Sequence, residues 1–296
     1  MEAGVPIDLL LPVVIALMML AVGMGLRPGD FRAVAAAPLA AVLGFVGMFV
    51  VFPLLAFAVA AAFRLEPALA IGLVLLAASP SASTSTMFTY LARGDVALSV
   101  ALTSVSKVVP VATVPAYVSL AAQAFAGERL EVEISFAETS EAIVTTILLP
   151  TIAGMALNRY VPAAAAWRPH VTRVSVLLLV VLIGVLAFRE RTTLPGMFAS
   201  SGPAALTLCV LGMASAFAAA SIARLSRGAR SALTIELGMQ SGGTSIAIAA
   251  GVLAAPAMAV PAAVYSLIMY VAAAAFVLLE RSAEPGAAPD VSRAVR

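Results

Sequence analysis

Nine apolar stretches, each of about 18 residues or more, follow one another along this chain of 296 residues. Runs of that length are typical of helices that cross a bilayer, because about 20 helical residues span the hydrocarbon core. Charged residues make up only 11% of the chain, whereas soluble domains carry about 25%. The sequence therefore predicts an all-α polytopic membrane protein with nine transmembrane helices. The expected spans are roughly 6–26, 33–63, 66–92, 96–126, 139–160, 171–189, 200–225, 230–254 and 257–280.

The arginines predict how these spans are oriented. With nine spans, twelve arginines fall in loops or tails on one side and four on the other. The positive-inside rule then places the N-terminus outside and the C-terminus in the cytoplasm. The preference for alanine, and for arginine over lysine, indicates a GC-rich bacterial genome. The expected location is therefore a bacterial cytoplasmic (inner) membrane. The arginines are too scattered for a nucleic-acid site, and the tail at 281–296 is expected to be a disordered cytoplasmic segment.

Two opposite charges lie inside apolar runs. Lys107 is about eleven residues into the run Val96–Phe125, and Glu236 lies within Ala232–Leu253. A charge at the bilayer centre costs at least ~2.5–3.5 kcal/mol on insertion scales. Because such residues are expensive, Lys107 and Glu236 predict a functional site within the membrane.

Two of the runs are interrupted by residues that disfavour helix. The third contains the stretch Ser79–Thr86 with Pro80, and the eighth contains Gln240–Ser245 with the pair Gly242 and Gly243. Proline removes a backbone donor and glycine weakens a helix. Broken backbone at membrane depth must be enclosed by protein. Paired broken helices in two halves of a chain indicate the substrate site of an inverted-repeat transporter.

The polar residues near these interruptions suit a cation and an anion. Ser99, Thr103 and Lys107 are spaced i, i+4, i+8 on one helix face, while Glu236 and Gln240 lead into the second interruption. Hydroxyls, a carboxylate and backbone carbonyls are the hard oxygen ligands that an alkali cation prefers. N-termini of half-helices favour anions. The residues thus predict a cation site beside an organic-anion site, in a secondary transporter whose small-molecule partner is an organic anion.

Two other classes of function fit the sequence less well. A receptor or sensor would be expected to carry a soluble signalling domain, and an intramembrane enzyme would need a catalytic set such as paired Asp or a Ser/His pair. The single Cys209 and the single His170 argue against a disulfide framework and against a Cys/His metal site. No enzymatic activity and no cofactor are expected beyond a coupling ion. The oligomeric state is left open, and a monomer is compatible with the sequence.

Three segments of the chain resemble the bile acid:sodium symporter family, in a bacterial form. They are Gly23–Phe31, Thr89–Ser106 and Ala232–Gln240, and the resemblance extends over about residues 6–280. It implies a nine-span form in which residues 6–126 and 139–280 are inverted repeats. It also implies a core domain with two crossed discontinuous helices, and a panel domain made of spans one, five and six. Sodium symport by alternating access, with a bile-acid-like or other carboxylate substrate, is the function it implies.

The resemblance also implies ligand positions. One sodium site would comprise Ser85, Thr86, Ser99, Thr103 and Glu236, with Thr86 where an asparagine is usual. A second would comprise Glu236, Gln240 and the carbonyls of Leu237 and Met239, with Met48 where a glutamine is usual, and a thioether is a poor ligand for a hard cation. The substrate positions would be Ser83, Ser241, Gly242, Met269 and Tyr270.

Lys107 departs from the resemblance, because a small polar residue is usual there. One hypothesis is that its ammonium occupies or neighbours a cation site and balances Glu236, since an unpaired buried charge is costlier than a pair. Transport would then be sodium-independent or proton-coupled, because a buried lysine shifts its pKa readily. The alternatives are a direct ligand for the anionic substrate, and a structural ion pair or water-exposed lysine.

Overall fold

The computed structural model describes residues 7–25, 37–126, 144–161, 166–174 and 194–282, together with the single positions 141, 163, 177, 178, 181 and 192. Within these residues all regular structure is helical, apart from one pair of bridged residues. The helices are α1 (Ile7–Gly23), α3 (Pro38–Val46), α4 (Phe52–Ala62), α5 (Pro67–Ala78), α6 (Ser85–Leu91), α7 (Val96–Ser106), α8 (Pro110–Phe125), α10 (Leu149–Tyr160), α12 (Leu194–Ile222), α13 (Arg227–Gly238), α14 (Gly242–Ala247) and α15 (Val260–Ser282). The π-helical turns are η2 (Gly47–Val51), η4 (Val144–Leu148) and η5 (Ile248–Val252), and η6 (Pro256–Ala259) is a 3-10 helix.

Three continuous helical stretches among the described residues are long and apolar enough to cross a membrane: Pro38–Ala62, Pro195–Ile222 and Pro256–Ser282. Large apolar side chains on the last of these point outward, including Leu267, Val271 and Leu278 at 69%, 72% and 68% exposure. Such a surface needs lipid around it. The prediction of a helical membrane protein is confirmed. The count of nine spans stays a prediction, because the sixth run lies mostly outside the described residues, as do residues 283–296 of the expected tail. α15 itself runs to Ser282, two residues into that segment.

The second and fourth apolar runs both contain proline-linked irregularities. In the second, the π-helical turn η2 directly precedes α4, whose second residue is Pro53. In the fourth, α7 ends at Ser106 and α8 begins at Pro110. A proline has no backbone N–H to donate to the preceding turn of a helix. The last turn of α7 is tightened, and the Lys107 N–H donates a hydrogen bond to the Ser104 carbonyl. The fourth run is therefore two helices, and Lys107 lies at the turn between them.

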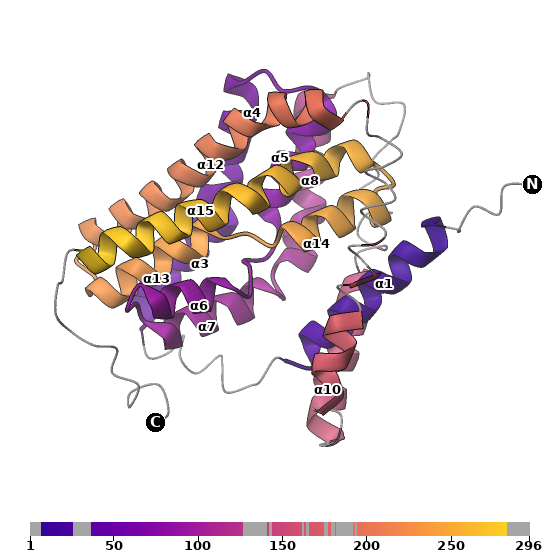
Figure 1. The fold of residues 1–296 in the computed structure, drawn as a ribbon, viewed down its shortest axis with the longest axis horizontal. Helices are drawn as coiled ribbons and strands as arrows, with labels where there is room; N and C mark the ends of the chain where they lie inside the picture. Colours follow the sequence, from indigo (N-terminus) through magenta and orange to yellow (C-terminus); the bar gives the residue numbers. More distant parts are fainter. Residues whose placement is uncertain are drawn as a thin grey trace, which may run out of the picture.

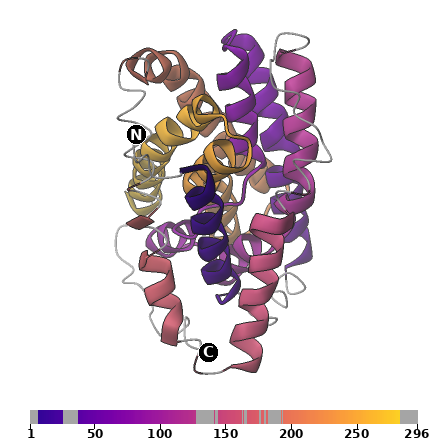
Figure 2. The same ribbon diagram turned by 90° about the vertical axis from the view of Figure 1, so that its right-hand side faces the viewer.

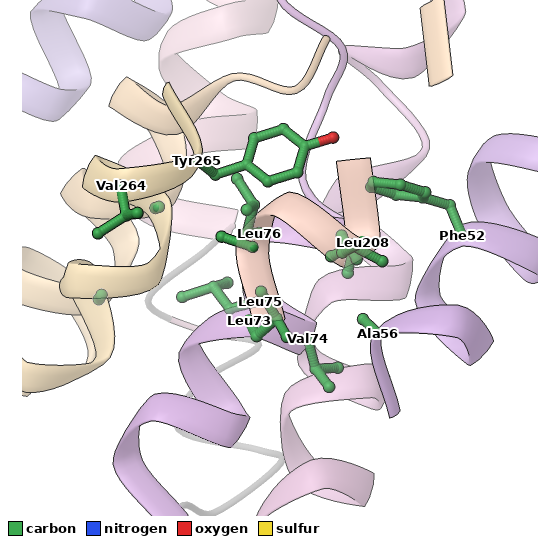
Figure 3. Packing of buried hydrophobic residues seen from close by; sticks show 14 of the residues in the cluster. Phe52, Ala56, Leu73, Val74, Leu75, Leu76, Leu208, Val264 and Tyr265 are labelled. Atoms are coloured by element: carbon green, nitrogen blue, oxygen red, sulfur yellow. The ribbon is translucent and has the colours of Figure 1, made fainter. Parts of the chain in front are cut away.

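The centre of the molecule is built around α5, which is buried from Leu69 to Ala78. It packs against α4, α8, α15 and η6. Figure 3 shows the run Leu73–Leu76 between the side chains of α15 and those of α4, with Tyr265 on one side and Phe52 on the other. The rings of Phe52 and Tyr265 meet edge to face at 6.4 Å between centroids. This cluster buries the C-terminal end of α5 inside the protein.

α1 and α10 lie side by side at one edge of the molecule (Figures 1 and 2). Their backbones are in contact, because a Cβ at Gly23 would lie 2.1 Å from the Thr151 carbonyl oxygen and one at Gly154 would lie 2.2 Å from that of Leu20. Small residues permit this close approach of membrane helices. The pair reaches the rest of the molecule where α1 packs against η5 and α14. They belong to spans one and five of the expected panel. The division into panel and core domains stays a prediction.

Two helices are interrupted inside the molecule. The first break is Ser79–Thr84, between α5 and α6, and the second break is Met239–Ser241, between α13 and α14. The breaks lie against each other and exchange backbone hydrogen bonds: Ala82 N donates to Met239 O, and Ser241 N donates to Pro80 O, both at 2.8 Å. Ser81 and Gln240 form the bridge between them. Each break thus supplies the backbone partners that the other has lost.

Candidate functional site

The carboxylate of Glu236 lies fully buried near the end of α13, beside the paired breaks. Four hydroxyl groups surround it, and they are called the hydroxyl cage here: Ser81, Ser85, Ser99 and Thr103. Oε1 accepts hydrogen bonds from Ser85 Oγ at 2.6 Å, Ser99 Oγ at 2.5 Å and Thr103 Oγ1 at 3.0 Å. Oε2 accepts from Ser81 Oγ at 2.7 Å and Thr103 Oγ1 at 3.1 Å. Both carboxylate oxygens therefore accept hydrogen bonds from neutral hydroxyl groups.

The cage is assembled from the first break, α6, α7 and α13. Asp95 caps α7 by accepting from Leu98 N at 3.0 Å, and its own N–H donates to Gly228 O near the start of α13 at 2.9 Å. Both bonds fix the position of α7 relative to α13. Ser99 and Thr103 are then one turn apart and face the same carboxylate. A cap of this kind contributes about 1 kcal/mol to a helix.

The five residues expected in the first sodium site lie together. Ser85, Ser99 and Thr103 all contact Glu236, and Ser99 Oγ lies 3.2 Å from Thr86 Oγ1. Their role in holding a cation stays a prediction.

Sequence reasoning did not single out Ser81 or Ser106 as site residues. Ser81 contacts the carboxylate directly. Ser106 accepts from the Ser81 N–H at 3.2 Å, lies 3.2 Å from Ser81 Oγ and donates to Thr103 O at 2.9 Å. A hydroxyl three residues after Thr103 was the available signal, since residues i and i+3 share a helix face. Ser106 fixes the position of Ser81 within the first break.

The residues expected in the second sodium site form a different environment. Gln240 Nε2 donates to Leu237 O at 3.1 Å, and Met239 O accepts from Ala82 N. Gly238 O, between those two carbonyls, accepts from Tyr265 Oη at 3.0 Å and contacts Cys209 Sγ at 3.8 Å. The carbonyls at the end of α13 are therefore paired with donors from the protein. Tyr265 and Cys209 were not expected here, because α15 and α12 are distant in sequence.

Met48 and Lys107 lie outside the hydroxyl cage. Met48 is buried in the turn η2 among apolar side chains that include Leu98, Leu102 and Leu237. Lys107 is half-buried, directly after Ser106, where α7 ends, and it has an interaction partner. The hydrogen bonds described for Glu236 come from hydroxyl groups. An ion pair of Lys107 with Glu236 stays a prediction.

The expected substrate residues lie at the breaks and on α15. Ser83 is exposed in the first break, next to Thr84, whose Oγ1 lies 3.5 Å from Tyr270 Oη. In the second break, Ser241 Oγ lies 2.7 Å from Thr244 Oγ1. The remaining two are buried: Gly242 packs closely on α15, and Met269 belongs to the central core. Of this set, Ser83 and Tyr270 are exposed and Ser241 is half-buried.

Comparison with known proteins gives this geometry a context. The model of the sodium bile acid symporter family matches residues 12–196. The chain is 28% identical over 258 residues to the "Uncharacterized sodium-dependent transporter YocS" of Bacillus subtilis, which covers 86% of this chain and 77% of that protein. It is 28% identical over 270 residues to the "Probable sodium/metabolite cotransporter BASS2, chloroplastic" of rice, covering 90% of this chain. It is 30% identical over 254 residues to BASS1 of Arabidopsis thaliana, covering 84% of this chain.

The two chloroplastic relatives are longer, since these matches span 62% and 61% of their lengths. The family match covers more than half of this chain and includes the first break, α6 and α7, which carry the hydroxyl cage. The protein has apolar helices long enough to cross a bilayer. It is therefore a multi-pass membrane protein that belongs to the sodium bile acid symporter family.

Proposed function

We propose that this protein is a secondary active transporter that couples the movement of a small organic anion to sodium. The observation that carries the proposal is the hydroxyl cage around Glu236, a fully buried carboxylate at the junction of two broken helices. Relatives named as sodium-dependent or sodium/metabolite transporters support the choice of ion. The substrate is a bile-acid-like molecule or another carboxylate.

The chemistry of the cage suits a sodium ion. A hydroxyl that donates its proton to Glu236 keeps oxygen lone pairs for a cation. Ser85, Ser99 and Thr103 would offer such oxygens next to the negative charge, and Thr86 would extend the set. Hard oxygen donors around one carboxylate match the preference of a hard cation. The bound ion would supply the positive charge that a buried carboxylate needs.

The proposed transport cycle uses inverted repeats and alternating access. Matching features of the two halves support the repeats: α5 and α13 each have 12 residues and end in a break. Each follows a helix that is succeeded, two residues after its end, by an arginine with positive φ, Arg64 at 50° and Arg224 at 53°. In this proposal α1, α10 and the sixth span form a panel, and the paired breaks belong to a core that shifts against it. The nine spans would place the N-terminus outside a bacterial inner membrane.

The anion would bind where the breaks meet α15. Ser83 and Tyr270 are exposed there, and Ser241 contributes a further hydroxyl. Phe88 and Tyr270 are close, with ring centroids 6.0 Å apart, and they provide an apolar surface beside these polar groups. An amphipathic carboxylate requires this combination of polar and apolar contacts.

A thermal-shift screen tests the proposal. The purified full chain would be heated with a panel of organic acids, in sodium and in choline buffers. We expect sodium to raise the Tm, and an organic acid to raise it further only when sodium is present, because a ligand stabilises the state it binds. Glu236→Gln should abolish the sodium effect. Glu280→Gln, a matched change at a carboxylate paired with Arg227 outside the cage, should preserve it. No response of the wild type to sodium would contradict the proposal.

A sodium-independent or proton-coupled carrier is the second candidate. It rests on Lys107, which directly follows Ser106, a residue in contact with the cage residue Ser81. Its ammonium would take over the role of a cation, or it would contact the anionic substrate. In this case organic acids would stabilise the wild type in choline buffer, and Lys107→Ser would acquire a requirement for sodium. An unchanged dependence on sodium in Lys107→Ser would exclude this candidate.

A further inference from the structure

We infer that sodium leaves the hydroxyl cage toward the arginine-rich end of the molecule along the contact between α6 and α13, where Thr89 and Ser231 hold water for it. The inference rests on the proposed function, and it adds a route for the ion and two residues that line this route. Neither hydroxyl bonds to Glu236. Neither residue belongs to the sodium or substrate positions expected from the sequence.

The first observation is that two buried hydroxyl groups lack a partner. Thr89 is 0% exposed and Ser231 is 1% exposed, and within the described residues neither Thr89 Oγ1 nor Ser231 Oγ has a hydrogen-bond partner. A buried hydroxyl in a helix commonly donates to the carbonyl four residues earlier, as Ser79 and Thr234 do at 2.8 Å. An unpaired buried polar group is costly and calls for a ligand such as water or an ion. Thr89 and Ser231 therefore mark a polar site inside the protein.

The second observation is where these hydroxyls lie along α6 and α13, which pack against each other (Figure 1). At one end of the contact, Ser85 donates to Glu236, and at the other end the backbone that follows α6 donates to Gly228 O at 2.9 Å. The two helices are therefore antiparallel. Thr89 is one turn beyond Ser85, and Ser231 lies between Gly228 and Glu236. Both hydroxyls thus lie between the cage and the far end of the contact.

The side chain of Thr89 lies close to the start of α13. Thr89 shares a face of α6 with Ser85, because the two residues are four apart. A Cβ at Gly94 would lie 2.8 Å from Thr89 Cγ2 and 3.3 Å from Gly228 O. Ser231 follows Gly228 by three residues, so these two share a side of α13. The backbone of two glycines therefore closes the contact just beyond the two hydroxyls.

The far end of the contact is rich in arginine, and it is the side that the sequence predicts to be cytoplasmic. Arg281 Nε donates to Leu91 O at the end of α6 at 2.8 Å, and Arg227 Nε donates to Glu280 Oε2 at 2.7 Å. Arg230 Nε is also buried without a partner, but its guanidinium lies over an aromatic ring of α12, 4.6 Å from the centroid. The basic side chains near the start of α13 are thus engaged with α15 and α12.

The chemistry of release requires oxygen atoms beyond the cage. A bare cation in an apolar interface is very costly, so a departing ion must exchange its oxygen ligands one at a time. At ~1.5 Å per residue Thr89 lies about 6 Å beyond Ser85, where a water molecule that it holds can reach an ion still in contact with the cage. A buried water needs at least two polar partners, which Thr89 and Ser231 supply. The two hydroxyls therefore lower the barrier to release and add nothing to the bound state.

The test separates the rate of sodium release from the affinity for sodium. The purified full chain in detergent would be loaded with radioactive sodium and diluted into choline buffer, and the retained sodium would be measured by rapid filtration. A titration of thermal stability gives the affinity. In Thr89→Val and in Ser231→Ala we expect release to slow by roughly tenfold, as the loss of one hydrogen-bonding group would, with unchanged affinity. Thr89→Ser keeps the hydroxyl and should release sodium at the wild-type rate.

The matched controls remove hydroxyls on α12. Thr207→Val and Ser221→Ala should change neither the rate nor the affinity. Wild-type release rates in both Thr89→Val and Ser231→Ala would overturn the inference and leave the proposed function intact, as would a lowered affinity, which would make these residues part of the binding site. Absence of saturable sodium binding to the wild type would overturn the proposed function itself. Ser231→Ala decides the inference if Thr89→Val does not melt cooperatively.

Discussion

The two breaks have closely similar backbone surroundings and different chemistry. α5 and α13 have the same length, and the two breaks donate and accept equivalent backbone hydrogen bonds. Yet the first break and α6 contribute hydroxyl groups, whereas α13 contributes the carboxylate of Glu236. The exchanged backbone hydrogen bonds match between the two breaks, and the side chains do not. A near-symmetric frame can thus hold an asymmetric site, because side chains can change while the exchanged backbone bonds are kept.

The largest expected effect comes from adding a methyl group at a closely packed glycine in each half of the chain. A Cβ at Gly72 in α5 would lie 2.1 Å from the backbone oxygen of Met258, whereas one at Gly242 in α14 would lie 1.8 Å from Ser266 Oγ, a side chain that can rotate. We expect Gly72→Ala to cost about 3 kcal/mol and Gly242→Ala about 1 kcal/mol, as overpacking typically does. Melting temperatures in detergent measure both. Gly202→Ala, with no atom within 4 Å of its new Cβ, is the control; equal losses at Gly72 and Gly242 would contradict the difference.

The second prediction concerns the hydroxyls that make the two breaks unlike. Ser85→Ala removes a donor 2.6 Å from Glu236 Oε1, and with it an oxygen of the proposed sodium site. Hydrogen bonds to charged groups contribute about 1.5–3 kcal/mol. We expect sodium affinity to fall by roughly 10- to 100-fold in a titration of thermal stability. Thr113→Ala, which removes a hydroxyl on α8, should leave the affinity unchanged. An undiminished affinity in Ser85→Ala would place the ion elsewhere.

A smaller effect is expected from the groups that pair the last carbonyls of the two helices. Leu75 O is paired locally, by Ser79 Oγ at 2.8 Å, whereas Gly238 O is paired from another helix, by Tyr265. Ser79→Ala and Tyr265→Phe each remove one neutral hydrogen bond, so each should lower stability by about 1 kcal/mol. Thermal melts of the two variants and of their combination would measure this. A combined loss equal to either single loss would show that the two helix ends are not independent.

The smallest expected effect concerns the arginines that precede α5 and α13. Arg64 and Arg224 both adopt positive φ, where glycine is more favourable. Replacing either with glycine relieves about 1–2 kcal/mol of backbone strain. Part of this gain is offset, because glycine loses more backbone entropy on folding and the charge that interacts with the helix dipole is removed. We expect net changes within about 1 kcal/mol that are the same for both positions. Opposite signs at Arg64 and Arg224 would show that the two turns are not equivalent.

Much of the candidate site could be predicted from the sequence. Pro80 predicted the first break, although Ser85 and Thr86, expected within it, belong to α6. The second interruption was predicted at Gln240–Ser245 from Gly242 and Gly243, but both glycines begin α14 and the break lies just before them, at Met239–Ser241. The i, i+4 spacing of Ser99 and Thr103 predicted that they share a face, and both contact Glu236. Their role as sodium ligands stays a prediction.

Other features could not be read from the sequence. Ser81 lies in a stretch with several hydroxyls, and backbone without a helical period does not reveal which of them points inward. Tyr265 and Cys209 reach Gly238 O through the packing of α15 and α12, which no local pattern encodes. The turn at Lys107 follows from Pro110, but apolar periodicity continues through it. Lys107 therefore appeared to lie in the middle of one helix, whereas it is the C-cap residue directly after α7.

The exchanged bonds between the breaks also constrain how the chain is made. Pro80 O and Ala82 N find their backbone partners at Ser241 and Met239, which are synthesised much later. A chain made from its N-terminus therefore carries an incomplete first break until the second arrives. In lipid those groups cannot remain unpaired, so they must be hydrated or shielded during this interval. The first half can therefore reach its final form only once the second half has been inserted. Truncation before Met239 should leave an unstable fragment.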